Sequence, residues 1–159
     1  MARFPTEVER TVTVRVALPR VYDFLWDVPV SSRCLPGLLS CTPIGEDTFR
    51  FLYDDWSAGP LRMAVHYTAT YTGNGVDEIR FESTGARGDN TEVSGLFRLQ
   101  PSGMEATRIM VRQLLAPDTP IPRLLQSLIR SFLDREAADG VERYLRSVKR
   151  ALEDIPRPS

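Results

Sequence analysis

Few residues of this 159-residue chain have side chains suited to catalysis or metal binding: one histidine, His66, and two cysteines, Cys34 and Cys41. His66 falls on the polar side of an alternating segment, so we interpret it as a surface residue. A His-based triad would also need a nucleophile and an orienting acid, which the sequence does not place beside it. The cysteines lack the Cys-x-x-Cys spacing of zinc sites. We therefore expect free thiols, no metal and no cofactor.

A larger group of side chains is suited to holding a small molecule. Strand parity puts aromatic and polar residues on the inner face of the expected sheet, namely Tyr53, Met63, Tyr67, Tyr71, Phe81, Phe97 and Gln113. A buried phenol or amide needs a hydrogen-bond partner, which a ligand or a trapped water could provide. An ordinary aromatic core is the alternative interpretation. From the C-terminal helix we assign Leu125, Leu128 and Phe132 to the cavity wall, and Val141 and Leu145 to ordinary core.

The hydrophobic pattern predicts the elements that position these side chains. Val8 to Ala17 alternates as a strand, and Pro19 opens a short helix that carries Val21, Phe24 and Leu25. A second short helix or turn covers residues 30–35. Six strands joined by turns then follow from Leu38 to Leu115, with 61–71 as one uninterrupted strand. Residues 123–153 contain no proline and have helical character.

This order predicts an α+β fold in one domain, residues 1–159, with its core at about 6–153. A sheet with one apolar face needs a covering layer, and only the last helix, roughly 45 Å long at 1.5 Å per residue, can cross it. A curved antiparallel sheet closed around one helix tends to leave space that side chains do not fill. We expect a cavity there.

The most specific segments are LPRVYDFLWD (18–27) and CLPGL (34–38). They resemble the opening of the START and Bet v 1-like superfamily, also called SRPBCC. The second segment resembles the polyketide cyclase branch of that superfamily and the branch associated with carbon monoxide dehydrogenase. The resemblance extends from about Thr6 to Leu152. It implies the helix-grip fold, in the order β-α-α-β6-α, with an apolar cavity. The superfamily includes carriers, receptors, cyclases and chaperone activators, so the resemblance implies little about chemistry.

Composition narrows the choice of partners. The net charge of -1 gives no basic excess for nucleic acid, and no run approaches the ~18 apolar residues of an integral membrane segment. The first residues lack the apolar core of a secretion signal, so we expect the cytoplasm. The sequence leaves the oligomeric state open.

We expect the chain to bind or carry an apolar or amphipathic small molecule without catalysis. One alternative is a cyclase or dehydratase-like enzyme, which needs an acid and a base converging on the ligand; no close pair of acidic residues falls on the expected inner face. The second alternative is a protein-interaction module, whose mark would be an exposed apolar patch.

Overall fold

The computed structural model describes residues 2–3, 5–54, 56–58, 61–119 and 123–154, and it describes the side chains of 5–54, 64–118 and 123–154. Its elements follow one another as β1 (Ala2–Arg3), β2 (Thr6–Val14), α1 (Leu18–Trp26), α2 (Val28–Ser31), the 3-10 turn η1 (Ser32–Cys34), β3 (Leu38–Gly45), β4 (Thr48–Tyr53), β5 (Trp56–Ala58), β6 (Leu61–Met63), β7 (His66–Gly73), β8 (Glu78–Ser83), β9 (Thr91–Pro101), β10 (Thr107–Thr119), the 3-10 turn η2 (Arg123–Leu125) and α3 (Gln126–Glu153).

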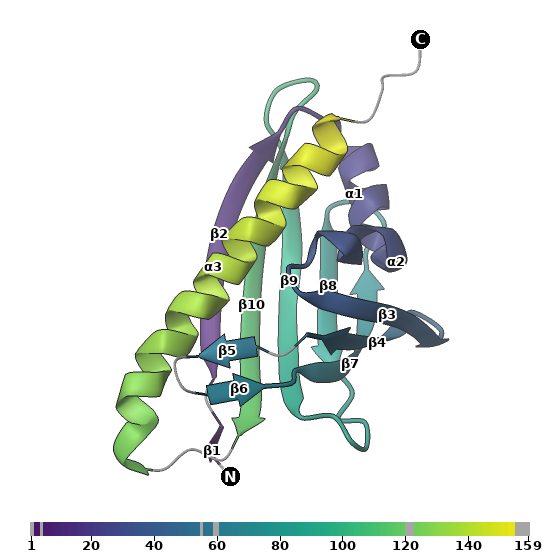
Figure 1. Ribbon diagram of the computed structural model, residues 1–159. Helices are drawn as coiled ribbons and strands as arrows, with labels where there is room; N and C mark the ends of the chain where they lie inside the picture. The colour runs from purple at the N-terminus through teal and green to yellow at the C-terminus, as the bar shows by residue number, and fades with distance from the viewer. Residues whose placement is uncertain (1, 4, 55, 59–60, 120–122, 155–159) are drawn as a thin grey trace.

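Seven of these strands form one antiparallel sheet in the order β2-β10-β9-β8-β7-β4-β3, and β1 pairs with the end of β10. The helix α3 runs diagonally across one face of this sheet, as Figure 1 shows. β4, β8, β9 and β10 each pair with the strand that precedes them in the sequence, so turns or loops can connect them. β7 pairs with β4, and the β5–β6 hairpin lies between these two in the sequence. The expected α+β order and helix-grip arrangement are confirmed.

The core lies between α3 and the sheet. On α3 the buried residues recur every three or four positions: Ile129, Leu133, Ala137, Val141, Tyr144, Leu145, Val148 and Leu152. This spacing places them along one side of the helix. The six from Ala137 to Leu152 belong to one hydrophobic cluster with strand residues such as Val14, Phe51 and Ile109, none of which is exposed at all.

The short helix α1 closes one end of the sheet. Val21 and Leu25 are buried in the core, and the Tyr22 hydroxyl accepts a hydrogen bond of 2.8 Å from the backbone N–H of Gly75. Gly73 makes this approach possible, because a Cβ atom there would collide with the Tyr22 hydroxyl. A polar contact and a glycine thus attach α1 to the turn between β7 and β8.

The expected single strand over 61–71 is wrong. The chain forms β6, leaves the strand at Ala64 and Val65, and resumes as β7; β6 pairs with β5 in a separate two-stranded hairpin. The side chain of Asn90 holds this interruption, because its oxygen accepts the N–H of His66 at 3.0 Å and its nitrogen donates to the Ala64 carbonyl. A period-two pattern predicts extended chain but cannot name its pairing partner, which is set by distant residues.

Within the described residues, no helix has both the length and the apolar character needed to cross a membrane. Cys34 and Cys41 are free cysteines, each half-buried. Burial raises the pKa of both thiols, and a hydrogen bond from Ser32 opposes part of that effect at Cys41. A raised pKa keeps a thiol protonated and unreactive at neutral pH.

Candidate ligand-binding cavity

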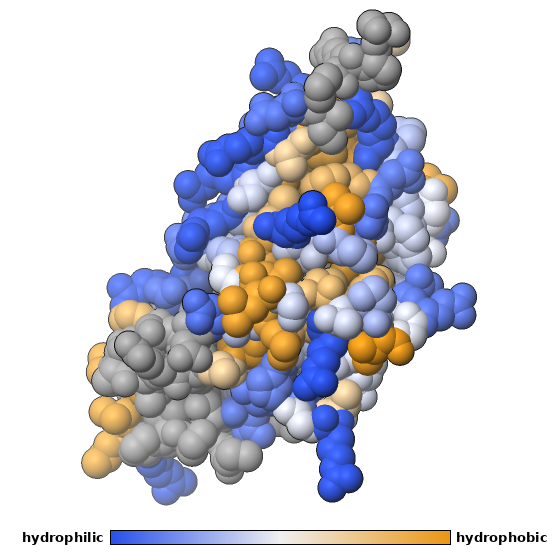
Figure 2. Space-filling model, turned by 45° about the vertical axis from the view of Figure 1, so that its right-hand side comes forward, coloured by the Kyte–Doolittle hydropathy of each residue, from blue (hydrophilic) through white to orange (hydrophobic). Residues whose placement is uncertain are grey.

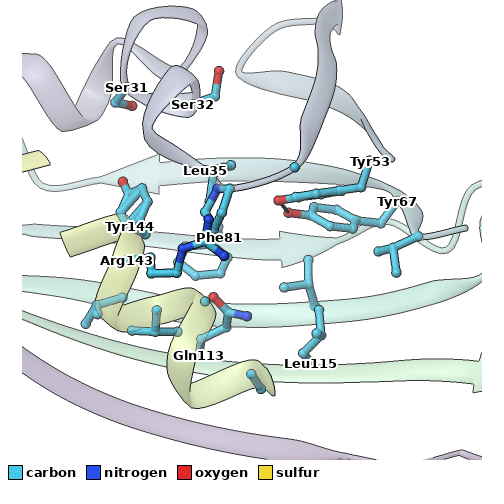
Figure 3. Close-up of a pocket in the computed structure, with 18 of the residues that line it drawn as sticks. Ser31, Ser32, Leu35, Tyr53, Tyr67, Phe81, Gln113, Leu115, Arg143 and Tyr144 are labelled. Carbon is cyan, nitrogen blue, oxygen red and sulfur yellow. Dashed lines mark hydrogen bonds between the residues drawn. The ribbon is translucent and has the colours of Figure 1, made fainter. Parts of the chain in front are cut away.

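A cavity of about 390 Å³ lies between the inner face of the sheet, α3 and the segment that runs from α2 to Gly37. This size falls within the range of sites that hold small molecules. Figure 3 shows side chains converging on it from the sheet behind, from α3 in front and from the loop above. Its aliphatic wall is supplied chiefly by Leu25, Val28, Leu35, Val65, Val93, Val111 and Leu115.

An unbroken series of aromatic rings runs along the sheet beside this wall. Ring centroids are 5.0 Å apart for Phe51 and Tyr67, 6.4 Å for Phe51 and Tyr71, 5.7 Å for Tyr71 and Phe81, and 5.8 Å for Phe81 and Phe97. The series continues to Tyr144 on α3, whose ring centroid is 6.1 Å from that of Phe97. The sheet register places Tyr71 directly opposite Phe81 on the neighbouring strand. Such distances are typical of favourable ring pairs, so this wall is held in place by its own contacts.

Gly95 on β9 gives the Phe81 ring its position. A Cβ atom at Gly95 would collide with that ring and with the backbone carbonyl of Arg112. Gly95 is also the residue opposite Phe81 in the register of β8 and β9. The ring therefore lies over bare backbone, as is typical where a strand glycine permits a close approach.

The hydroxyl and amide groups on the cavity wall are only partly satisfied. Tyr53 and Tyr67 share a hydrogen bond of 3.0 Å between their hydroxyls, drawn as a dashed line in Figure 3. Within the described part of the chain, Tyr71, Gln113 and Tyr144 have no hydrogen-bond partner for their side chains. All three side chains line the cavity, so their polar groups are available to a bound molecule.

Burial keeps the four cavity tyrosines uncharged. It raises the pKa of Tyr53 to about 12, although the hydrogen bond from Tyr67 opposes the shift. It also raises the pKa values of Tyr67, Tyr71 and Tyr144 well above their ordinary range. At neutral pH each therefore presents a protonated hydroxyl, which can donate a hydrogen bond or accept one.

Among the described residues that line the cavity, the charged ones lie toward its solvent-facing edge. We call Asp54, Glu136, Asp139 and Arg143 the charged rim; all four contribute to the lining, and Glu136 is half-buried while the others are exposed. Arg143 lies 3.8 Å from Asp139 one helical turn away. On the face turned forward in Figure 2, apolar surface is likewise bordered by hydrophilic side chains. The site thus combines an apolar, uncharged interior with a charged opening.

Solved structures with the same arrangement span almost the whole chain. A START superfamily protein from Mycobacterium smegmatis has a TM-score of 0.71 at 12% identity, covering 94% of this chain and 99% of its own. A conserved protein from Geobacillus kaustophilus has a TM-score of 0.71 at 14% identity, with coverage of 92% and 94%. The Zhui aromatase/cyclase from Streptomyces has a TM-score of 0.62 at 17% identity, with coverage of 93% and 91%.

The chain has the START/Bet v 1-like fold. The expected resemblance is thereby confirmed at the level of fold. No family model and no curated protein sequence matches the chain. The function must therefore be argued from the cavity itself.

Six of the residues expected at the START/Bet v 1-like cavity lie on its wall: Tyr53, Tyr67, Tyr71, Phe81, Phe97 and Gln113. The side chain of Met63 lies outside the described residues. Strand parity places side chains well because alternate residues of a strand point to opposite faces of the sheet. That geometry holds wherever the strand itself was correctly identified.

The three expected helix residues lie elsewhere. Leu125 and Leu128 are 39% and 69% exposed, and Phe132 is half-buried outside the cavity with the Arg135 guanidinium 5.5 Å from its ring centroid. Leu128 stands nine residues before Ala137, which places it about 180° around an α-helix of 3.6 residues per turn. The side of α3 that carries Leu128 therefore faces away from the cavity.

The middle of α3 supplies the cavity wall instead, through Glu136, Ala137, Gly140, Val141 and Tyr144. We expected Val141 to be ordinary core, and neither Gly140 nor Tyr144 was assigned to the cavity. One signal in the sequence points to this site. Gly140 and Tyr144 lie four residues apart, on one side of the helix, and tyrosine interrupts an otherwise aliphatic stripe.

His66 lies partly enclosed, not on the open surface. Its side chain is 27% exposed, and its Nδ1 lies 3.8 Å from Oδ1 of Asp89, whose side chain is 7% exposed. The 84–90 loop folds back over β7, because Thr84 N–H donates to the Thr68 carbonyl and Asn90 N–H donates to the His66 carbonyl. His66 does not line the cavity.

Proposed function

We propose that this protein binds an apolar or amphipathic small molecule in its START/Bet v 1-like cavity and acts as a carrier or sensor without catalysis. The observation that carries the proposal is an apolar cavity of about 390 Å³ with polar groups on its wall that the described chain leaves unpaired. A cavity that served only as core would be filled by side chains. Aromatic walls with a few polar groups are typical of small-molecule sites.

A catalytic role is the second candidate, supported by the Tyr53 and Tyr67 hydroxyl pair and by the likeness to aromatase/cyclases. Because burial raises the pKa of both phenols, they would serve as proton donors and not as bases. The carboxylates that could act as bases are the rim residues Asp54, Glu136 and Asp139. Binding without turnover of a bound probe would favour the carrier; chemical conversion of the probe would favour an enzyme.

The binding proposal is tested by native mass spectrometry of freshly purified protein and by titration with a fluorescent apolar dye. We expect saturable binding and a melting temperature that rises with dye concentration, since a ligand that binds only the native state stabilises it. Ala137→Leu, which extends a cavity-lining side chain, should weaken dye binding. Ala151→Leu, on the same helix but outside the lining, is the matched control. Equal binding by wild type and Ala137→Leu would place the dye elsewhere.

A further inference from the structure

The side of α3 that faces the cavity has a residue without a side chain, Gly140, near the middle of the helix. Gly140 lines the cavity, and a Cβ atom built there would have nothing within 4 Å. Glu136 stands one turn before it and Tyr144 one turn after it, and both also line the cavity. The two are about 12 Å apart along the helix axis, at 1.5 Å per residue. An elongated molecule lying against Gly140 would therefore meet a carboxylate at one end and a phenol at the other.

Tyr144 lies at the buried end of the segment from Glu136 to Tyr144. The residue is 8% exposed, and its hydroxyl has no hydrogen-bond partner within the described residues. Figure 3 shows the hydroxyl end of Tyr144 directed toward the part of the cavity where Ser31 and Ser32 lie. Burial keeps the pKa of this hydroxyl well above neutrality, so it can donate its proton in a hydrogen bond. An oxygen atom of a ligand would satisfy it.

Glu136 lies at the other end of this segment and carries a negative charge. It is half-buried and, in the described part of the chain, forms no hydrogen bond or ion pair. The Arg143 guanidinium of the charged rim lies 3.8 Å from the carboxylate of Asp139, not from that of Glu136. A carboxylate without a protein partner beside a cavity can form a charge-assisted hydrogen bond to a cationic ligand group. A cationic group entering the cavity would supply the missing charge.

We propose that the cavity takes an elongated amphiphile that carries a protonated amine at one end, bound by Glu136, and an oxygen acceptor at the other, bound by Tyr144. The body of the molecule lies along α3 at Gly140. This inference rests on the proposed binding function and names its ligand class.

Three probes with ten carbon atoms each test the charged end: decylamine, decan-1-ol and decanoate, each titrated by displacement of the apolar dye. We expect decylamine to bind about fivefold more tightly than decan-1-ol, as for a partly exposed ion pair, and decanoate to bind most weakly. Glu136→Gln should abolish the preference for the amine. Glu142→Gln is the control, since it removes one carboxylate from the same helix outside the cavity, where Glu142 pairs with Arg10 at 3.2 Å.

The second end is tested with 10-aminodecan-1-ol, which adds a hydroxyl to the amine probe. It should bind more tightly than decylamine to the wild type and no more tightly to Tyr144→Phe. Three results would each overturn this inference: equal affinities for the three ten-carbon probes, tightest binding of decanoate, or the same response from Glu142→Gln as from Glu136→Gln. In each case, saturable dye binding would still support the proposed function. Failure of every probe, the dye included, would overturn both.

Discussion

The hydroxyl groups of Tyr53 and Tyr67 lie 3.0 Å apart in the cavity wall, although the two residues belong to strands that are separated in sequence by a hairpin. They meet because β4 pairs with β7, with Phe51 opposite Tyr67, and because the Tyr53 N–H donates to the Val65 carbonyl at 3.0 Å. Each hydroxyl satisfies the other in an apolar setting. Their hydrogen bond should therefore contribute measurably to stability.

Tyr67→Phe should lower the free energy of unfolding by about 1–2 kcal/mol, because it leaves the Tyr53 hydroxyl buried without its partner. The double variant Tyr53→Phe/Tyr67→Phe should cost less than the sum of the two single changes, since it leaves no unpaired hydroxyl. Urea unfolding of the four proteins measures this coupling. Tyr71→Phe is the control, because the Tyr71 hydroxyl has no partner within the described residues. Strictly additive costs would contradict the pairing.

Alkaline pH should destabilise the fold through the cavity tyrosines. Burial raises the pKa of Tyr53 from 10.0 to about 12, and it raises those of Tyr67, Tyr71 and Tyr144 well above their ordinary value. Above pH 10 the unfolded state thus loses these protons first, so the free energy of unfolding falls as the pH rises. Urea midpoints measured on either side of pH 10 test this. Replacing Tyr144 by phenylalanine should make the decline shallower, and an identical decline would show that this residue is not responsible.

Gly140→Ala should raise the free energy of unfolding by about 0.5–1 kcal/mol, the difference in helix propensity between the two residues. The added methyl group enters open space, since nothing lies within 4 Å of its position. Gly140→Leu should instead occupy the cavity and weaken dye binding. Chemical denaturation and dye titration measure the two effects. A destabilised Gly140→Ala variant would mean that the position is not open.

An exposed and a buried leucine of α3 should differ in their sensitivity to truncation. Leu145 is 4% exposed, and Leu145→Ala should cost about 2–5 kcal/mol, as for a well-packed leucine. Leu128 is 69% exposed, and Leu128→Ala should change stability by less than about 0.5 kcal/mol. Urea melts of both variants give the comparison. A large cost at Leu128 would show that its side chain is covered, for instance by a second protein chain.

The order of elements and most of the sheet side of the cavity could be predicted from the amino-acid sequence. Residues such as Tyr71, Phe81 and Phe97 lie in strands whose alternation is unbroken, and in such a strand local geometry alone determines which side chains share a face. The long C-terminal segment had to be the covering layer, because no other helical segment could cross the sheet. These conclusions depend only on local periodicity and length.

Only the tertiary structure decided how α3 is rotated against the sheet and where the strand over 61–71 is interrupted. The helix has apolar residues on more than one side, so its periodicity left open whether Leu128 or Val141 would face inward. The interruption at Ala64 depends on Asn90, which is distant in the sequence. Both choices are made by packing and hydrogen bonding between residues far apart along the chain, and no local pattern contains that information.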